Sequence, residues 1–234
     1  MTSLSYKRHL VACSYLTFLC LPHALQADDL FIDAGADTGL PELQIGDAYG
    51  TSGSVGLLDV DGDLDLDLLL TMGERDPVEL YLNESTPEEI LFTDASVEAG
   101  LSDLPGHTIG FGVGDFNGDG WVDVYLCNKG RDSLLFNQGG GLFEDVTETH
   151  LDGYDSWSSS ASVADFDGDG DLDIYLTRYV LMFNFPFHIS ESDALLVNDG
   201  DGVFVNRAAD YGIDNPGASL ASVWSDIDMD GDLD

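Results

Sequence analysis

One nine-residue pattern occurs four times in this chain and limits its possible folds more than any other feature. The copies, numbered here as loops one to four, are DVDGDLDLD at Asp59–Asp67, DFNGDGWVD at Asp115–Asp123, DFDGDGDLD at Asp165–Asp173 and DIDMDGDLD at Asp226–Asp234. Positions 1, 3, 5 and 9 of every copy carry a carboxylate or a carboxamide. Alternating oxygen side chains on a tight loop suit a hard cation such as Ca²⁺, at distances of about 2.3–2.6 Å. The sequence therefore predicts up to four calcium loops.

The residues after each loop distinguish it from an EF-hand, whose calcium loop carries a bidentate Glu at position 12 between two helices. In the first three copies, position 12 is Leu70, Leu126 or Leu176. The chain continues there as LDLLLTM, VDVYLCN and LDIYLTR. Such short apolar runs are typical of buried strands. Each loop is therefore expected to connect two strands.

Each loop belongs to a repeat of about 50–60 residues, a size found in propellers and solenoids. A Gly- or Ser-rich strand is expected before the loop, in GTSGSVGLLD, HTIGFGVGD, SSSASVAD and LASVWSD. After the apolar strand, a third strand ends at an Asn (VELYLN, DSLLFN, DALLVN) and a fourth follows a polar turn (LFTDAS, LFEDVT, VFVNRA). Four short antiparallel strands per repeat describe one propeller blade. The predicted fold is all-β, a β-propeller of four-stranded antiparallel blades.

The repeats make up only part of a ring. Leu30–Leu40 (LFIDAGADTGL) matches Leu91–Leu101 (LFTDASVEAGL) at six of eleven positions, which indicates a fourth strand without its three partners. Three whole repeats follow, and then the first strand and loop of another, ending at Asp234. Closed propellers have about four to eight blades. We therefore expect a partial ring of about three blades plus parts of two, in a chain truncated at its C-terminus.

The start of the chain is predicted to be a secretory signal over 1–27, followed by the partial propeller over 28–234. A basic start at Lys7–His9 precedes the apolar run Leu10–Leu21, and Leu25–Ala27 offers a cleavage site. The apolar run is shorter than the roughly 20 residues of a membrane span. The expected product is secreted and extracellular, or periplasmic or cell-surface if the source is bacterial, with no membrane span.

Charge and cysteine content narrow the possible partners and the means of stabilisation. The chain carries 45 acidic and 7 basic residues, a formal net charge of −38. Electrostatic repulsion then excludes nucleic acid and anionic membrane surfaces as direct partners. Only Cys127 remains after the predicted signal, so no intrachain disulfide can form. Bound cations would neutralise part of the acidic charge and brace the loops instead.

These motifs resemble a known family. The DFNGDGWVD-type loops, the preceding Phe111-Gly112 and the LFxDV-type strands are similar to the FG-GAP or VCBS repeats of integrin-α-type propellers. Over Leu30–Asp234 the chain most resembles bacterial ASPIC/UnbV-type proteins and the cartilage acidic protein. The resemblance implies a ring of about seven blades, within the usual range for propellers, with a calcium loop between the first two strands of each blade. It also implies adhesion or ligand binding.

The resemblance implies a ligand set as well, in which positions 1, 3, 5 and 9 give side-chain oxygens and position 7 gives its backbone carbonyl. The side-chain ligands would be Asp59, Asp61, Asp63, Asp67, Asp115, Asn117, Asp119, Asp123, Asp165, Asp167, Asp169, Asp173, Asp226, Asp228, Asp230 and Asp234. The carbonyl ligands would be Asp65, Trp121, Asp171 and Asp232.

Loop one departs from the pattern at position 6. Loops two, three and four have Gly120, Gly170 and Gly231 there, whereas loop one has Leu64. If this position requires a left-handed backbone, leucine is strained and glycine is not. Loop one is therefore expected to be the weakest cation site.

The sequence shows no convincing catalytic arrangement. His107, His150 and His188 stand beside no paired carboxylate or activated serine. The glycines of Gly110–Asp115 are followed by a loop and a strand, not by the helix of a dinucleotide site, and more simply permit close packing. The aromatic insertion Tyr179–His188 is either a binding loop or a segment that packs on a neighbouring part.

The favoured interpretation is a secreted, calcium-stabilised binding or adhesion module for an extracellular protein or glycan, and not an enzyme. The alternative is a propeller enzyme, such as a calcium-dependent polysaccharide lyase, with its catalytic residues in blades outside this chain.

Overall fold

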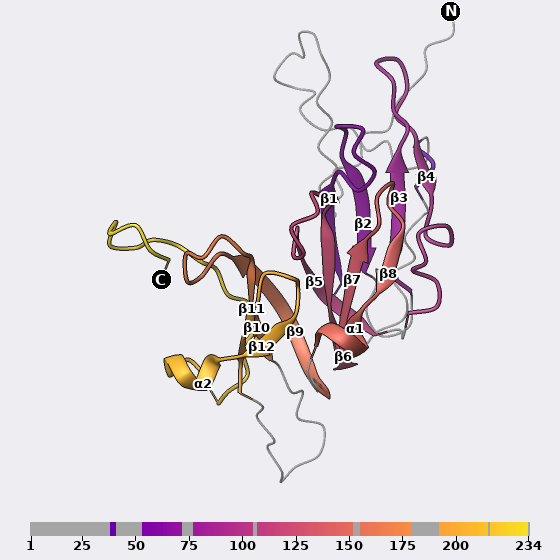
Figure 1. Ribbon diagram of the computed structural model, residues 1–234. Coiled ribbons are helices and arrows are strands. Elements are labelled where there is room, and N and C mark those ends of the chain that lie inside the picture. Colours follow the sequence, from indigo (N-terminus) through magenta and orange to yellow (C-terminus); the bar gives the residue numbers. More distant parts are fainter. Residues whose placement is uncertain are drawn as a thin grey trace, which may run out of the picture.

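The computed structural model describes residues 38–40, 53–71, 77–104, 107–151, 155–178, 192–214 and 216–233. These residues form three consecutive groups of four antiparallel strands, here called blades one to three (Figure 1). Blade one contains β1 (Ser54–Leu58), β2 (Asp67–Thr71), β3 (Glu79–Asn83) and β4 (Phe92–Asp94). Blade two contains β5 (Thr108–Gly114), β6 (Asp123–Arg131), β7 (Ser133–Asn137) and β8 (Phe143–Asp145). Blade three contains β9 (Asp155–Ala164), β10 (Asp173–Arg178), β11 (Ala194–Asn198) and β12 (Phe204–Asn206).

This arrangement confirms the all-β fold and the four-strand repeat predicted from the sequence. In each blade the first strand pairs with the second, the second with the third and the third with the fourth, all antiparallel. Short helices, α1 (Thr147–His150) and α2 (Ala208–Tyr211), follow β8 and β12. No helix among the described residues is long and apolar enough to cross a membrane.

Blades two and three are joined by a pairing that the sequence did not predict. Beyond its apolar core, β6 continues through Lys129–Arg131, which pairs antiparallel with Asp155–Trp157 at the start of β9. The two blades therefore share one eight-stranded sheet, whereas blade one is a separate four-stranded sheet. The pairing segment of β6 is polar, so the apolar pattern that marks the rest of β6 gives no sign of it.

The predicted first strand of a fourth repeat, LASVWSD, is wrong for the described residues: 217–226 form no strand. In the other blades the first strand pairs with the strand that follows its loop, whereas the described residues end at Leu233, within loop four. Side chains hold the segment instead. Ser162 Oγ donates to Ser222 O at 2.7 Å, and Trp224 Nε1 donates to Ser162 O at 3.2 Å.

The hydrophobic core lies between blades, because successive residues of a strand point to opposite faces. In β6, Val124 and Leu126 pack with residues of blade one, whereas Tyr125 and Cys127 pack with residues of blade three. Full burial of one large apolar side chain contributes about 1.5–3 kcal/mol. Each blade is therefore stabilised by its neighbours. Cys127 is a buried, unpaired thiol, as the cysteine count implies.

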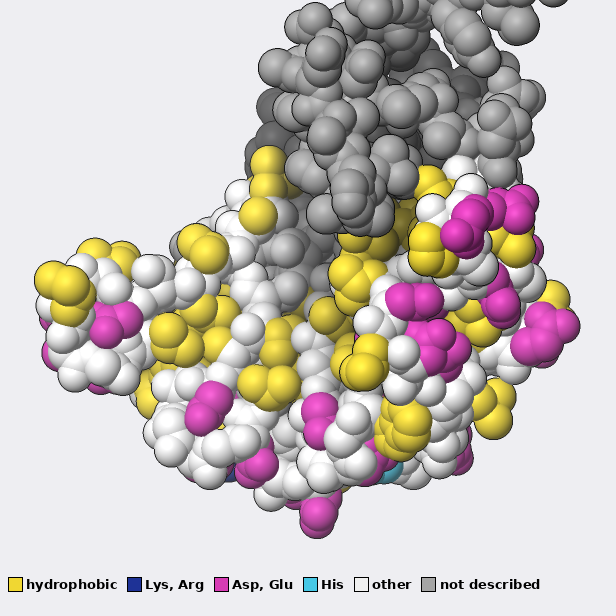
Figure 2. Space-filling model, turned by 90° about the horizontal axis from the view of Figure 1, so that it is seen from above, with side chains coloured by type: hydrophobic (Ala, Val, Ile, Leu, Met, Phe, Trp, Pro, Cys, Tyr) yellow, Lys and Arg dark blue, Asp and Glu magenta, His cyan; other side chains and the backbone are white. Residues whose placement is uncertain are grey.

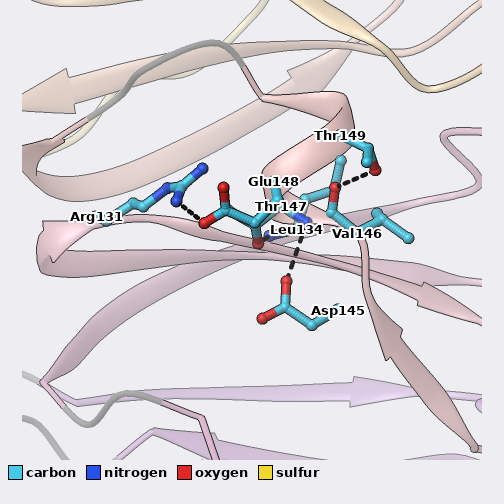
Figure 3. A network of polar contacts seen from close by, with 7 residues as sticks. All are labelled: Arg131, Leu134, Asp145, Val146, Thr147, Glu148 and Thr149. Atoms are coloured by element: carbon cyan, nitrogen blue, oxygen red, sulfur yellow. Dashed lines mark hydrogen bonds and ion pairs between the residues drawn. The ribbon is translucent and has the colours of Figure 1, made fainter.

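In blades one and two, the turn after the fourth strand is fixed by a short polar network, drawn for blade two in Figure 3. Asp145 Oδ1 accepts the N–H of Thr147, whose Oγ1 accepts the N–H of Leu134 in β7 at 2.9 Å. Arg131 forms an ion pair with Glu148 beside them. In blade one, the hydroxyl of Ser96 has the same role as that of Thr147, because it accepts the N–H of Leu80. These contacts anchor the end of the blade to its third strand.

Only the end of the predicted orphan strand Leu30–Leu40 belongs to the described residues. Thr38 is 3% exposed, and its carbonyl accepts the N–H of Phe92 in β4 at 2.8 Å. The aligned residue of the next repeat, Ala99, accepts the N–H of Phe143 in β8 at 3.0 Å. The two segments therefore make the same contact with the following blade, which supports the predicted repeat at Thr38–Leu40. The predicted signal and residues 30–37 lie outside the described residues.

Candidate metal centres

Each loop winds around the carboxylate at its position 1. In loop two, Asp115 Oδ1 accepts the N–H of Asp119 at 3.1 Å, and its Oδ2 accepts the N–H of Gly120 at 2.9 Å. The position 1 carboxylates of the other loops also accept N–H groups from within the loop; these residues are Asp59, Asp165 and Asp226. The position 5 carboxylate accepts the N–H of position 7 in all four loops. The backbone therefore turns inward around its own acidic side chains.

The position 9 carboxylate has a second role that the sequence did not reveal. Asp123 is fully buried; its Oδ2 accepts the N–H of Phe116 at 2.9 Å, and its Oδ1 accepts the N–H of Asn137 at 2.8 Å. Asp67 and Asp173 make the equivalent contacts in loops one and three. Position 9 thus joins the start of its loop to the end of the third strand, and its remaining lone pairs are available to a ligand. Asp234 lies outside the described residues.

Three of the loops bring carboxylates close enough to share one cation. In each group, one oxygen per residue lies within 4.8 Å of the others. The groups are Asp59, Asp61 and Asp67 in loop one, Asp165, Asp167 and Asp173 in loop three, and Asp226, Asp228 and Asp230 in loop four. In loop two, position 3 is Asn117, whose Nδ2 donates to Asp119 Oδ2 at 3.0 Å. Figure 2 shows that acidic side chains form separate groups on the face seen there, with apolar side chains between them.

Two positions of every loop have a left-handed backbone. Position 6 has φ of 77° at Leu64 and 91–101° at the glycines of the other loops. This confirms the requirement on which the prediction for loop one rests. Position 4 is also left-handed, and there Met229 of loop four, with φ of 64°, replaces glycine. Both side chains are exposed, Leu64 by 92% and Met229 by 87%, so burial does not offset the strain. Sequence reasoning missed Met229, although the DxDG pattern is broken there.

Asp65, at position 7 of loop one, presents more than its backbone to the loop. Its Oδ1 is buried and has no hydrogen-bond partner among the described residues. Burial first, and then the charges of Asp63, Asp67 and other loop carboxylates, raise the pKa of Asp65 to about 6. An ionised oxygen held in this way gains by binding a positive ion. The side chain of Asp65 is therefore a candidate ligand in addition to its carbonyl.

The other raised pKa values show the same crowding. Burial raises the pKa of Asp123 to about 6, although the N–H groups of Asn137 and Phe116 oppose the shift. Burial also raises the pKa of Asp67 and Asp173, and neighbouring carboxylates add to it. An all-oxygen donor set of mutually repelling carboxylates, one of them with an unsatisfied buried atom, fits a hard divalent cation.

Trp121, at position 7 of loop two, links two loops. A Cβ built on Gly62 of loop one would lie 2.8 Å from the ring of Trp121, and one built on Gly139 would lie 3.1 Å from it. The indole therefore packs directly against the backbone of loop one and of the β7–β8 turn. The sequence offers no signal for this contact, because it joins residues of different repeats.

The other motifs noted in the sequence have structural positions in the fold. Gly110 and Gly112 of β5 have no room for a side chain, because a Cβ would lie 2.7 Å from Ser159 O and 2.9 Å from Val163 Cγ2 of β9. They permit close packing of two blades, as expected. His150 lies in α1 with its ring against Phe136. Tyr179–His188 lies outside the described residues.

The repeated loops and their strands agree with a comparison to protein-family models. The FG-GAP-like repeat model matches residues 59–126 and 115–176, and each match spans two successive loops. The chain belongs to the FG-GAP-like repeat family. The two matches together run from loop one into β10.

No curated protein matches the chain. Among solved structures, it is similar to one described as an Agrocybe aegerita lectin that recognises non-reducing terminal N-acetylglucosamine, with 22% identity and a TM-score of 0.43. The match covers 68% of this chain and 38% of that one.

Proposed function

We propose that this chain is part of a secreted calcium-binding propeller that serves as a binding or adhesion module, with Ca²⁺ in a structural role and no catalytic activity. The observation that carries the proposal is the recurrence of closely grouped carboxylates in loops of one geometry, at equivalent places in an FG-GAP-like fold. Carboxylate oxygens of this kind suit Ca²⁺ better than softer metals.

The place of the loops explains why a structural role is favoured. Loops one, two and three each join the first two strands of a blade, and their position 9 carboxylates also hold the end of the third strand. Bound Ca²⁺ would neutralise the carboxylates that now repel one another. The chain's own residues then do the remaining work: position 1 curls the loop, and position 9 fixes three strands to one another. This would stabilise a mature chain in which Cys127, the one cysteine after the predicted signal, has no partner for an intrachain disulfide.

The binding role follows from the family resemblance, in particular to ASPIC/UnbV-type and cartilage acidic protein-type propellers. The class of ligand that we propose is an extracellular protein or a glycan. The net charge of −38 favours ligands that are neutral or basic over anionic ones. Secretion is supported by the predicted signal over 1–27. In extracellular modules, calcium sites have affinities of about 10⁻⁴–10⁻³ M.

The experiment that tests this proposal is an array of glycans and extracellular matrix proteins probed with the purified chain in Ca²⁺ and in EGTA. Saturable capture that depends on Ca²⁺ and leaves the ligand chemically unchanged is the expected result. Asp165→Asn, at position 1 of loop three, should weaken capture. The matched control is Asp103→Asn, which removes an exposed carboxylate outside the loops and should leave capture unchanged. Cleavage of an arrayed polysaccharide would contradict the proposal.

A further inference from the structure

In blades two and three, the asparagine that closes the third strand contacts two loops at once. The side-chain nitrogen of Asn137, in blade two, donates to Val60 O of loop one at 2.8 Å and to Val122 O of loop two at 3.3 Å. In blade three, Asn198 does the same with Phe116 O of loop two at 2.8 Å and Leu172 O of loop three at 3.2 Å. A single carboxamide therefore connects position 2 of one loop with position 8 of the next.

These contacts join into one continuous line. The N–H of Asn198 donates to Asp173 Oδ1 at position 9 of loop three, and its carboxamide reaches Phe116 of loop two. The N–H of Phe116 in turn donates to Asp123 Oδ2, and Asp123 Oδ1 accepts the N–H of Asn137. Asn137 then reaches loop one through Val60. The line thus runs from a candidate ligand of loop three through a candidate ligand of loop two to loop one.

The line is shielded from water. Asn137 and Val60 are fully buried, and Asp123, Phe116 and Asn198 are at most 4% exposed. Hydrogen bonds in such surroundings are stronger than in water, and each polarises the next. A buried donor or acceptor that loses its partner has no water to replace it. The elements along the line therefore order together.

We propose that loops one, two and three bind their cations with positive cooperativity, and that occupation of loop three raises the affinity of loop two. This inference rests on the proposed calcium binding. An ion that fixes position 9 of loop three holds Asn198 in place, and the carboxamide then holds position 2 of loop two before that loop binds. The second ion then has less of loop two to order. The two sites are thus coupled because they share one loss of conformational entropy. Simple repulsion between two cations would give the opposite sign, so the sign of the effect separates the two causes.

Trp121 supplies a local reporter for this test, because it lies within loop two and its ring packs on loop one. In the full chain carrying Trp157→Phe and Trp224→Phe, Trp121 is the only tryptophan. The fluorescence of this parent would be titrated with Ca²⁺, and total ion uptake would be measured by equilibrium dialysis on the same samples. Asp165→Asn then disables loop three and leaves all ligands of loop two intact.

In Asp165→Asn, the Ca²⁺ concentration at the midpoint of the Trp121 signal should rise fivefold or more relative to the parent. Fivefold is about the smallest factor that is typical of coupling between two sites. Asp226→Asn is the matched control, because it removes the same charge from loop four, which does not belong to the line. Asp226→Asn should bind one ion fewer than the parent and leave the Trp121 midpoint unchanged. In an Asn198→Ala background, Asp165→Asn should no longer move the midpoint.

The outcomes separate this inference from the function on which it rests. An unchanged midpoint, or one at lower Ca²⁺, overturns the coupling while ion uptake still supports the proposed function. Absence of ion uptake by the parent overturns both. If Asn198→Ala does not fold, or if Trp121 is silent, the dialysis curves of the parent and of Asp165→Asn decide. Uptake at the remaining sites that moves to higher Ca²⁺ in Asp165→Asn supports the coupling, and uptake that does not move contradicts it.

Discussion

Loops one and three share a nine-residue pattern but differ in how easily the backbone adopts it. In loop three, the two left-handed positions are glycines, Gly168 and Gly170. In loop one, the second of these positions is Leu64, for which a left-handed conformation costs about 1–2 kcal/mol. Loop one also holds the unsatisfied Oδ1 of Asp65. The comparison teaches that a ligand pattern alone does not rank cation sites: backbone cost lowers the expected affinity of loop one, and an additional oxygen partly offsets it.

The largest expected effect is the loss of stability when calcium is removed. A site with an affinity of about 10⁻⁴–10⁻³ M, at tenfold saturation, contributes about 1.4 kcal/mol by linkage. Several loops together make this the greatest single change. We expect EGTA to lower the melting temperature, and Ca²⁺ to restore it better than Mg²⁺. Asp165→Asn in loop three should lower the melting temperature in Ca²⁺ more than Asp59→Asn in loop one. An equal loss from the two variants would break the comparison.

The next effect is a pH dependence of stability that arises in the blade interior, outside the loops. Asp132 is 1% exposed and accepts hydrogen bonds from Tyr125, Ser158 and the N–H of Asn128, yet burial raises its pKa to about 7. The folded state therefore keeps the Asp132 proton up to about pH 7, whereas the unfolded state, with a pKa of about 3.9, releases it at lower pH. Stability from this group is present below about pH 4 and is lost as the pH rises to 7, on the order of a few kcal/mol.

This pH dependence should persist in chelator-stripped protein, because Asp132 lies outside the loops. Chemical unfolding of that protein in calcium-free buffer between pH 4 and 7.5 measures it, and Asp132→Asn should flatten the slope. A slope that Asp132→Asn leaves unchanged would assign the protons to other groups, including the loop carboxylates.

A third effect tests the backbone cost directly. Leu64→Gly removes the left-handed strain of about 1–2 kcal/mol, so calcium binding at loop one should tighten roughly 5- to 30-fold. Calorimetric titration with Ca²⁺ should show the largest change in the weakest site. Leu66→Gly, at position 8 of the same loop, is the matched control: Leu66 is half exposed, and it is not among the residues with positive φ. Weaker binding by Leu64→Gly would mean that the leucine supports the loop.

The smallest effect concerns loop four, where Met229 lies at position 4 with φ of 64°. Met229→Gly should tighten binding there by up to the same factor, and less if the position 9 ligand Asp234 dominates the site. A calorimetric titration of this variant beside Leu64→Gly sharpens the comparison, because it measures the same strain at a different position of the loop. A large gain in loop four with no gain in loop one would reverse the predicted ranking.

Sequence reasoning predicted the strands well, because their signals are local. Runs such as DVYLCN and DSLLFN carry apolar residues and end at a polar turn, and β6 and β7 form there. The left-handed position 6 was also predictable, since three loops carry glycine at it. The predicted fourth-repeat strand failed because a strand needs a partner for its backbone, which residue type alone does not supply.

What the sequence could not predict are the contacts between repeats. The asparagine that ends each third strand was visible as a marker, but its bond to the preceding loop depends on how blades stack. Asp132 and Asp193 stand before β7 and β11, where they accept hydrogen bonds from Tyr125 and Tyr175 and from serines of the following segment. Both networks join residues that are distant in sequence, and each is defined by geometry and not by residue pattern.

The central claim is that the grouped carboxylates are cation sites, and calcium uptake tests it most directly. Chelator-stripped full chain would be dialysed against free Ca²⁺ from micromolar to millimolar concentrations, and the bound ions counted. The account predicts uptake of up to four ions, loss of one ion in Asp165→Asn, and no loss in Asp103→Asn. A stripped chain that binds no Ca²⁺ at millimolar concentration would contradict it.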